Sequence, residues 1–157
     1  MVRVVLLETC FGSDGSQGDK ALRAGRFKLN NPMCKSDNNE EYNYITMDGK
    51  AIFKFAVSTI PKIVEELLEK SKLDISQVKY IVPHQANVRI IKDSARRLKV
   101  DMEKFYINLD KHGNTSAASI PIALSEMNEE KLLKKGDKII LVGFGGGLTW
   151  AGALIEW

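Results

Sequence analysis

The sequence of 157 residues is poor in cysteine, with only Cys10 and Cys34. Two cysteines are too few for the disulfide scaffold of a small secreted protein. They also lie too far apart for the Cys-x-x-Cys element of a zinc or redox site. We therefore expect a protein of a reducing, cytoplasmic compartment without a bound metal.

An excess of charge of one sign is also lacking. Lysine and arginine number 23 and aspartate and glutamate 20, which gives a net charge of +3. This small value gives no ground for a nucleic acid or another polyanion as partner. An apolar content of 44% with 27% charged residues is typical of a globular fold and excludes disorder. The length suits one domain with a sizeable core.

Long hydrophobic runs are scarce. The longest uncharged stretch, residues 139–155, approaches the length of a membrane-spanning helix. Glycines interrupt it at positions 143, 145, 146, 147 and 152, which favours turns. The amino terminus, MVRVVLLETCFG, is interrupted by Glu8 and makes a poor signal peptide. We therefore predict two strands joined by a glycine turn and expect no association with membranes.

Apolar periodicity divides the chain into alternating strands and helices. A continuous β-branched and leucine run predicts a strand at Val2–Leu7, and turn-forming residues predict a long loop over 12–44. Asp48 can cap a helix whose apolar stripe runs from Phe53 to Leu67 and continues past Pro61.

The later elements complete an α/β pattern. They are strands at Tyr80–Pro83, Phe105–Leu109, Lys138–Phe144 and Leu148–Trp157, and helices at Ala86–Leu98 and Thr115–Leu133. The order βαβαβαββ predicts a mostly parallel sheet that is covered by helices. The glycine link at 145–147 is long enough only for a hairpin, so the last strand should run antiparallel to its predecessor.

Polar residues follow two of the predicted strands. His84 comes directly after the strand at Tyr80–Pro83, and Asn114 comes one unit later, after the turn-permitting Gly113. Ligands of α/β sheets bind at the carboxyl ends of strands, so both side chains should share one rim, where two neutral donors would form an oxyanion hole. Two plainer interpretations stay open. His84 could be a half-buried histidine bonded to the backbone, and Asn114 or Thr115 could cap the next helix.

The glycine-rich segment 143–150 does not have the pattern of a phosphate-binding loop. It contains no Gly-x-Gly-x-x-Gly sequence that opens a helix, and no Lys-Ser/Thr pair follows. We interpret it as a hairpin turn, with Phe144 as a residue that can point into a site.

Three ordered motifs carry a resemblance to a known family: VPHQAN at 82–87, HGNTSAAS at 112–119 and FGGGLTW at 144–150. With SDGS at 13–16 and MDGKAIFKFAV at 47–57, they resemble the C-terminal half of β-ketoacyl-[acyl carrier protein] synthase III. The resemblance implies that residues 1–157 form a single half of a thiolase-like fold. The nucleophilic cysteine of that family lies in an N-terminal half, which we expect this chain to lack.

The same resemblance implies roles for individual residues. His84 and Asn114 match the catalytic histidine and asparagine, which stabilise the enolate formed when a malonyl group loses carbon dioxide. Asn87, Ala86, Gly49 and Phe144 match residues that bind substrate or coenzyme A, and Asn87 with the loop around Gly49 would line the pantetheine tunnel. Phe144 matches a phenylalanine beside the nucleophile.

A basic face is predicted on the helix at Ala86–Leu98. Arg89, Lys92 and Arg96 lie on one stripe of it. A solvated helix face is the plain interpretation. The resemblance adds another, in which Arg89, Gln85, Lys92 and Arg96 dock an acidic acyl carrier protein.

The implied activity is the decarboxylative Claisen condensation of an acyl-CoA primer with malonyl-acyl carrier protein in fatty acid biosynthesis. Both thioesters are substrates, and no cofactor is expected. Two alternatives stay open: a non-catalytic module that binds acyl carrier protein or coenzyme A, and half of another thiolase-superfamily condensing enzyme.

The isolated chain is expected to be inactive, because neither Cys10 nor Cys34 is predicted at a helix N-terminus that would stabilise a thiolate. The small-residue start of the third helix and the apolar helix over 53–67 are expected to pack against the N-terminal half. If that half is absent, we expect homo-oligomers or aggregates, because large open apolar patches usually mark interfaces.

Overall fold

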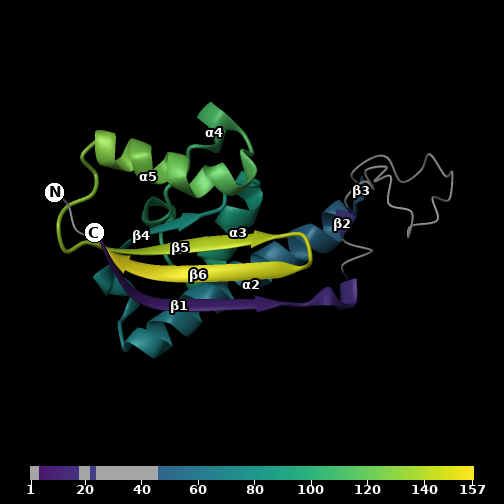
Figure 1. Cartoon of the computed structure of the whole chain (residues 1–157), viewed down its shortest axis with the longest axis horizontal. Helices are drawn as coiled ribbons and strands as arrows, with labels where there is room; N and C mark the ends of the chain where they lie inside the picture. Colours follow the sequence, from purple (N-terminus) through teal and green to yellow (C-terminus); the bar gives the residue numbers. More distant parts are fainter. Residues whose placement is uncertain (1–3, 18–21, 24–45) are drawn as a thin grey trace, which may run out of the picture.

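The computed structural model describes residues 4–17, 22–23 and 46–157 (Figure 1). Most of the predicted loop over 12–44, and with it Cys34, lies outside the described residues. The strands are β1 (Val5–Ser13), β2 (Leu22–Arg23), β3 (Thr46–Met47), β4 (Val78–Pro83), β5 (Lys138–Gly145) and β6 (Thr149–Glu156). The α-helices are α2 (Gly49–Ser71), α3 (Val88–Leu98), α4 (Leu109–His112) and α5 (Ser119–Glu129), with short 3₁₀ turns η1 (Gly15–Gln17), η3 (Ile75–Gln77), η4 (Met102–Lys104) and η5 (Ser116–Ala118).

The main sheet of the described residues has the strand order β1-β6-β5-β4. β4 pairs with β5 in parallel, whereas β6 runs antiparallel to both β5 and β1. Three strands therefore share one direction and the last strand opposes them, as the sequence predicted. Because β6 is inserted between β1 and β5, most neighbouring pairs are nevertheless antiparallel, and the sheet is mixed.

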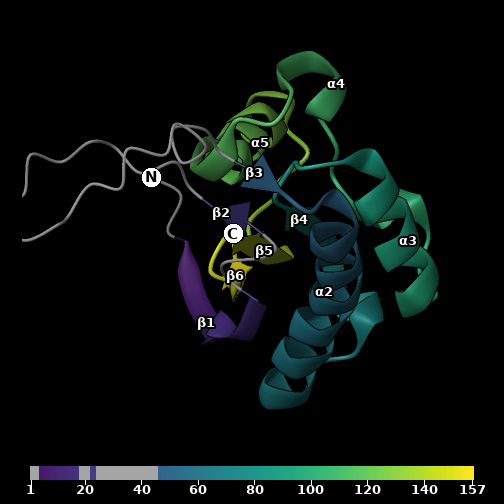
Figure 2. The ribbon, with the colours of Figure 1, turned by 90° about the vertical axis from the view of Figure 1, so that its right-hand side faces the viewer.

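Helices cover both faces of this sheet (Figure 2). α2 and α3 lie on one face and α5 on the other. The alternation of strand side chains explains the two layers, since successive residues point to opposite faces. Ile81 and Ile140 pack in the cluster with α2 and α3, whereas Val82 and Ile139 pack with α5. The α/β architecture is thus the one that the sequence predicted.

The long helix α2 confirms two local predictions. Asp48 is its N-cap, and the side-chain oxygen accepts from the backbone N–H groups of Lys50 at 2.9 Å and Ala51 at 3.1 Å. The helix continues through Pro61. α2 also approaches β6 closely at Gly152, where an added Cβ would clash with the side chain of Ile63. Glycine therefore permits this close approach, because a larger residue would force the neighbouring side chains or the helix to shift.

The predicted strand at Phe105–Leu109 is wrong. Only Phe105 forms a parallel bridge, to Ile81, and the N–H of Tyr106 donates to Ile81 O at 3.0 Å. The next backbone N–H that bonds in this segment, that of Asn108, has no strand residue as its partner. It donates to the side-chain oxygen of Gln85 at 3.2 Å. Residues from Leu109 then form α4.

Three further boundaries differ from prediction. β1 extends to Ser13 instead of ending at Leu7, which places Cys10 inside a strand. α3 begins at Val88, because Asn87 caps it. The third predicted helix is shortened to Ser119–Glu129, since residues 116–118 form the 3₁₀ turn η5.

The predicted hairpin is confirmed. β5 and β6 pair antiparallel from Lys138↔Glu156 to Gly145↔Thr149. Among the helices of the described residues, none is both long and apolar enough to cross a membrane.

Candidate functional site

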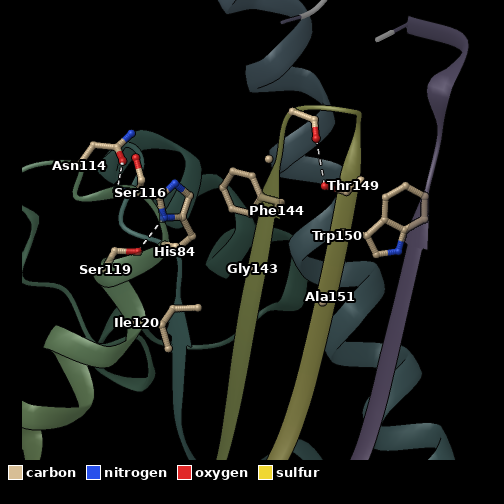
Figure 3. A pocket seen from close by; sticks show the side chains of 13 residues that line it. His84, Asn114, Ser116, Ser119, Ile120, Gly143, Phe144, Thr149, Trp150 and Ala151 are labelled. Carbon is tan, nitrogen blue, oxygen red and sulfur yellow. Dashed lines mark hydrogen bonds between the residues drawn. The ribbon is translucent and has the colours of Figure 1, made fainter. Parts of the chain in front are cut away.

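A cavity of about 620 Å³ opens at the carboxyl ends of β4 and β5 (Figure 3). Its wall includes the two residues singled out as oxyanion donors, His84 and Asn114. Phe144 and Trp150 come from the β5–β6 hairpin, and Ser119 from the start of α5. The topology therefore brings the three sequence motifs together at one rim of the sheet.

His84 is half-buried and firmly held. Its backbone N–H donates to Val142 O at 2.7 Å, which extends the β4–β5 ladder by one residue. The Phe144 ring lies edge-on to the imidazole, with ring centroids 5.4 Å apart. Burial lowers the pKa of His84 below its usual value. The lowered pKa favours the neutral form of the imidazole, which carries one N–H donor.

Ser119 contacts one nitrogen of the His84 imidazole. Its Oγ lies 2.7 Å from His84 Nδ1 and accepts from the backbone N–H of Gln85 at 3.3 Å. When the hydroxyl donates its hydrogen to Nδ1, the proton of the neutral ring lies on Nε2. His84 then offers Nε2–H as its free donor.

Asn114 stands on a turn that glycine makes possible. The preceding Gly113 has φ 69°, a backbone region that other residues rarely adopt. The side-chain Oδ1 of Asn114 accepts from the N–H of Ser116 at 3.1 Å, so the amide Nδ2 is left as the donor. Figure 3 shows the amide and the His84 ring on the same side of Phe144. The helix-cap alternative does not hold for α5, whose N-cap is Ala118 with no side-chain bond.

Of the residues expected to bind substrate or coenzyme A, Phe144 lies in the wall of this cavity, whereas Asn87, Gly49 and Ala86 do not. Asn87 is exposed, and its Oδ1 accepts from the N–H of Arg89 at 2.8 Å. Gly49 is the exposed first residue of α2, whose first turns lie at the same end of the sheet as the β5–β6 turn (Figure 1). Ala86 is half-buried against the core. Their binding role stays a prediction.

The basic face of α3 is present as predicted, with Arg89, Lys92 and Arg96 exposed. Asp93 forms an ion pair with Arg96 at 3.2 Å. The inclusion of Gln85 in this docking group is wrong. Only 1% of Gln85 is exposed, and its amide donates to Pro83 O and Tyr106 O inside the fold, so it does not lie on the exposed basic face.

Cys10 is not suited to nucleophilic chemistry. It is 3% exposed in β1, where its thiol faces Ile63 O, and it does not contribute to the cavity wall. Burial, with Glu66 nearby, raises the pKa of the thiol. A reactive cysteine needs the opposite shift.

Sequence reasoning missed Ser119 and Trp150 as cavity residues. Ser119 was assigned to a small-residue helix start that permits close packing, and a partner 35 positions away leaves no local pattern. Trp150 lies in the FGGGLTW motif and contacts the α2 residue Phe55, with ring centroids 6.0 Å apart.

Comparisons with known proteins agree with this architecture. A profile described as "3-Oxoacyl-[acyl-carrier-protein (ACP)] synthase III C terminal" matches residues 68–157. The chain is 55% identical over 152 residues to a beta-ketoacyl-[acyl-carrier-protein] synthase III of Clostridium botulinum strain Loch Maree, covering 97% of this chain and 46% of the relative.

Solved structures of the same family share this architecture. The 3-oxoacyl-[acyl-carrier-protein] synthase III of Aquifex aeolicus superimposes with a TM-score of 0.82 at 40% identity, covering 97% of this chain and 44% of that one. The Pseudomonas aeruginosa synthase III gives 0.84 at 37% identity, with the same coverage of both chains. The chain thus spans about half the length of its relatives, and it belongs to the family of 3-oxoacyl-[acyl-carrier-protein] synthase III C-terminal domains.

Proposed function

We propose that this chain is the C-terminal half of a β-ketoacyl-[acyl carrier protein] synthase III, which condenses an acyl-CoA primer with malonyl-acyl carrier protein. The observation that carries the proposal is the convergence of His84 and Asn114 in one cavity, each with a neutral N–H donor available. Relatives that bear the synthase name align with 97% of the chain.

The two donors suit the chemistry of decarboxylation. His84 Nε2–H and Asn114 Nδ2–H would bind the thioester carbonyl oxygen of the malonyl group. When the bond to the carboxylate breaks, its electron pair forms an enolate and carbon dioxide leaves. Donors aimed at the enolate oxygen stabilise this charge without a metal. A neutral His84 is suited to this task, because it donates a hydrogen bond without bringing a full charge into the cavity.

The condensation itself requires a second half. The enolate carbon would attack the acyl group held as a thioester on that half's cysteine, forming a carbon–carbon bond and releasing the thiolate. Cys10 is buried with a raised pKa, which supports a nucleophile outside the described residues. The primer acyl group and the malonyl group both arrive as thioesters, so the proposed reaction uses no cofactor.

The acyl carrier protein would dock beside the cavity on α3. Arg89, Lys92 and Arg96 are exposed there, and acidic partners associate with such faces through electrostatic attraction. Asn87 caps the same helix, and Gly49 and Ala86 are proposed to lie along the pantetheine.

The test completes the enzyme with the N-terminal half of the Clostridium botulinum relative and follows release of carbon dioxide from malonyl-acyl carrier protein. Replacement of His84 or Asn114 by alanine should lower this rate by roughly 100- to 1,000-fold, the usual cost of one oxyanion donor. Acylation of the partner half's cysteine should change little. Binding of the carrier protein without any decarboxylation would favour the non-catalytic binding module instead.

A further inference from the structure

Gln85 is buried directly behind the cavity and fully hydrogen-bonded. Its Nε2 donates to Pro83 O at 2.9 Å and to Tyr106 O at 3.1 Å. Its Oε1 accepts from the N–H of Asn108 at 3.2 Å. The residue that follows His84 thus joins the end of β4 to the segment that leads to Asn114.

Asn108 continues this connection. It is 2% exposed, and its Nδ2 donates to the Glu126 carboxylate on α5. Its backbone oxygen accepts from the N–H groups of Lys111 at 3.1 Å and His112 at 3.2 Å, which starts α4. Asn108 therefore links Gln85, α4 and α5 at one point.

Glu126 closes the connection on the other side. Its Oε1 lies 2.7 Å from His112 Nε2, and Tyr106 OH donates to its Oε2 at 3.3 Å. The hydrogen bond with His112, followed by that with Asn108, lowers the pKa of Glu126 to about 2. The group is therefore a carboxylate that accepts from three side chains. His112 lies two residues before Asn114.

The segment between Phe105 and α5 needs such support. In the described part of the chain, its backbone hydrogen bonds to the strands of the main sheet end with the Phe105 bridge and the Tyr106 N–H bond to Ile81. Gly113 adds a flexible position immediately before Asn114. The sheet positions His84, but it does not position Asn114.

We propose that Gln85, Asn108, Glu126 and His112 form a polar brace that positions the Asn114 amide relative to the His84 ring. The inference rests on the proposed function and names positioning residues, none of which lines the cavity. Two donors must meet at one oxygen atom, and a misplacement of about 1 Å can cost about 100-fold in rate.

The test uses Glu126→Gln and Gln85→Leu in the completed enzyme. Glu126→Gln keeps the size of the side chain but removes the charge that holds His112. We expect a loss of about 10- to 100-fold in decarboxylation, with acylation of the partner half's cysteine unchanged. The matched control is Glu129→Gln, one turn further along α5, where the carboxylate is exposed and bonds to Ser125; it should leave both rates unchanged.

A double-variant cycle separates positioning from general stability. If the brace acts through Asn114, Glu126→Gln should lower the residual rate of Asn114→Ala less than twofold, since contacting groups are non-additive. Full additivity, equal loss in both half-reactions, or a loss no larger than that of Glu129→Gln would overturn the proposal. Should Gln85→Leu fail to fold, Glu126→Gln decides alone.

Nuclear magnetic resonance of the full chain gives a readout that does not depend on activity. Glu126→Gln should shift or broaden the Asn114 side-chain amide signal, whereas Glu129→Gln should not. If the unmodified completed enzyme does not decarboxylate, the proposed function fails while this signal still tests the brace. An unchanged Asn114 signal in Glu126→Gln would overturn the proposed brace.

Discussion

His84 Nδ1 and Ser119 Oγ lie 2.7 Å apart, although 35 positions separate them in the chain. The contact joins the end of β4 to the first residue of α5. It engages Nδ1 of the ring. We predict that the serine hydroxyl donates to Nδ1, which would leave Nε2–H as the donor on which the proposed enolate stabilisation depends.

Ser119→Ala should weaken decarboxylation in the completed enzyme by about fivefold, because a hydrogen bond of this kind contributes about 1 kcal/mol. The ¹⁵N signals of the imidazole should report a mixture of tautomers. The chain has two histidines, so His112 serves as an internal control whose signals should not move. A single Nε2–H tautomer in the variant would contradict the assignment.

The pKa of Glu126 predicts how stability depends on pH. In the folded chain this pKa is about 2, below the reference value of 4.5. The stabilisation is therefore complete above about pH 4.5 and is lost as the pH falls toward 2, because the unfolded chain binds the proton more readily. Glu126→Gln should flatten this part of the profile in urea unfolding series. Glu129→Gln should leave it as steep as in the parent.

Gly152→Ala should destabilise the chain by about 1–3 kcal/mol, the usual cost of overpacking a core. The new Cβ would clash with Ile63 Cγ2 and lie 3.1 Å from Cys10 Sγ. Thermal unfolding measures the effect. Gly15→Ala is the control, since nothing lies within 4 Å of its added Cβ. Equal melting temperatures for the two variants would mean that α2 can move aside at little cost.

The chain should self-associate, but only part of the surface that the sequence indicated is open. The apolar face of α2 is buried on its own sheet, with Ile60 and Ile63 fully covered, whereas residues 116–118 are exposed. Apolar side chains are exposed instead along β1, where Leu6 is 61% and Phe11 83% exposed. Sedimentation at several concentrations should show oligomers, and Phe11→Ser should reduce them. A parent chain that is monomeric at high concentration would refute this prediction.

The sequence by itself determined the features that depend on near neighbours. Asp48 caps α2 through groups two and three residues away, and the glycine link permits only the β5–β6 hairpin. The rule that ligands gather at the carboxyl ends of strands placed His84 correctly at the rim. Asn114 reaches the same cavity without the strand that the sequence predicted before it.

The tertiary structure alone decided the features in which distant groups compete for one partner. In the sequence, Gln85 stands just before a predicted helix. In the structure, its buried side-chain oxygen accepts from the backbone N–H of Asn108, which a backbone oxygen of a neighbouring strand would otherwise have accepted. The predicted strand at Phe105–Leu109 ends for that reason. Ser119 likewise lies at the cavity as a hydrogen-bond partner only because folding brings it next to His84. A buried polar group must find a hydrogen-bond partner, and which partner lies within reach is decided only when the elements pack.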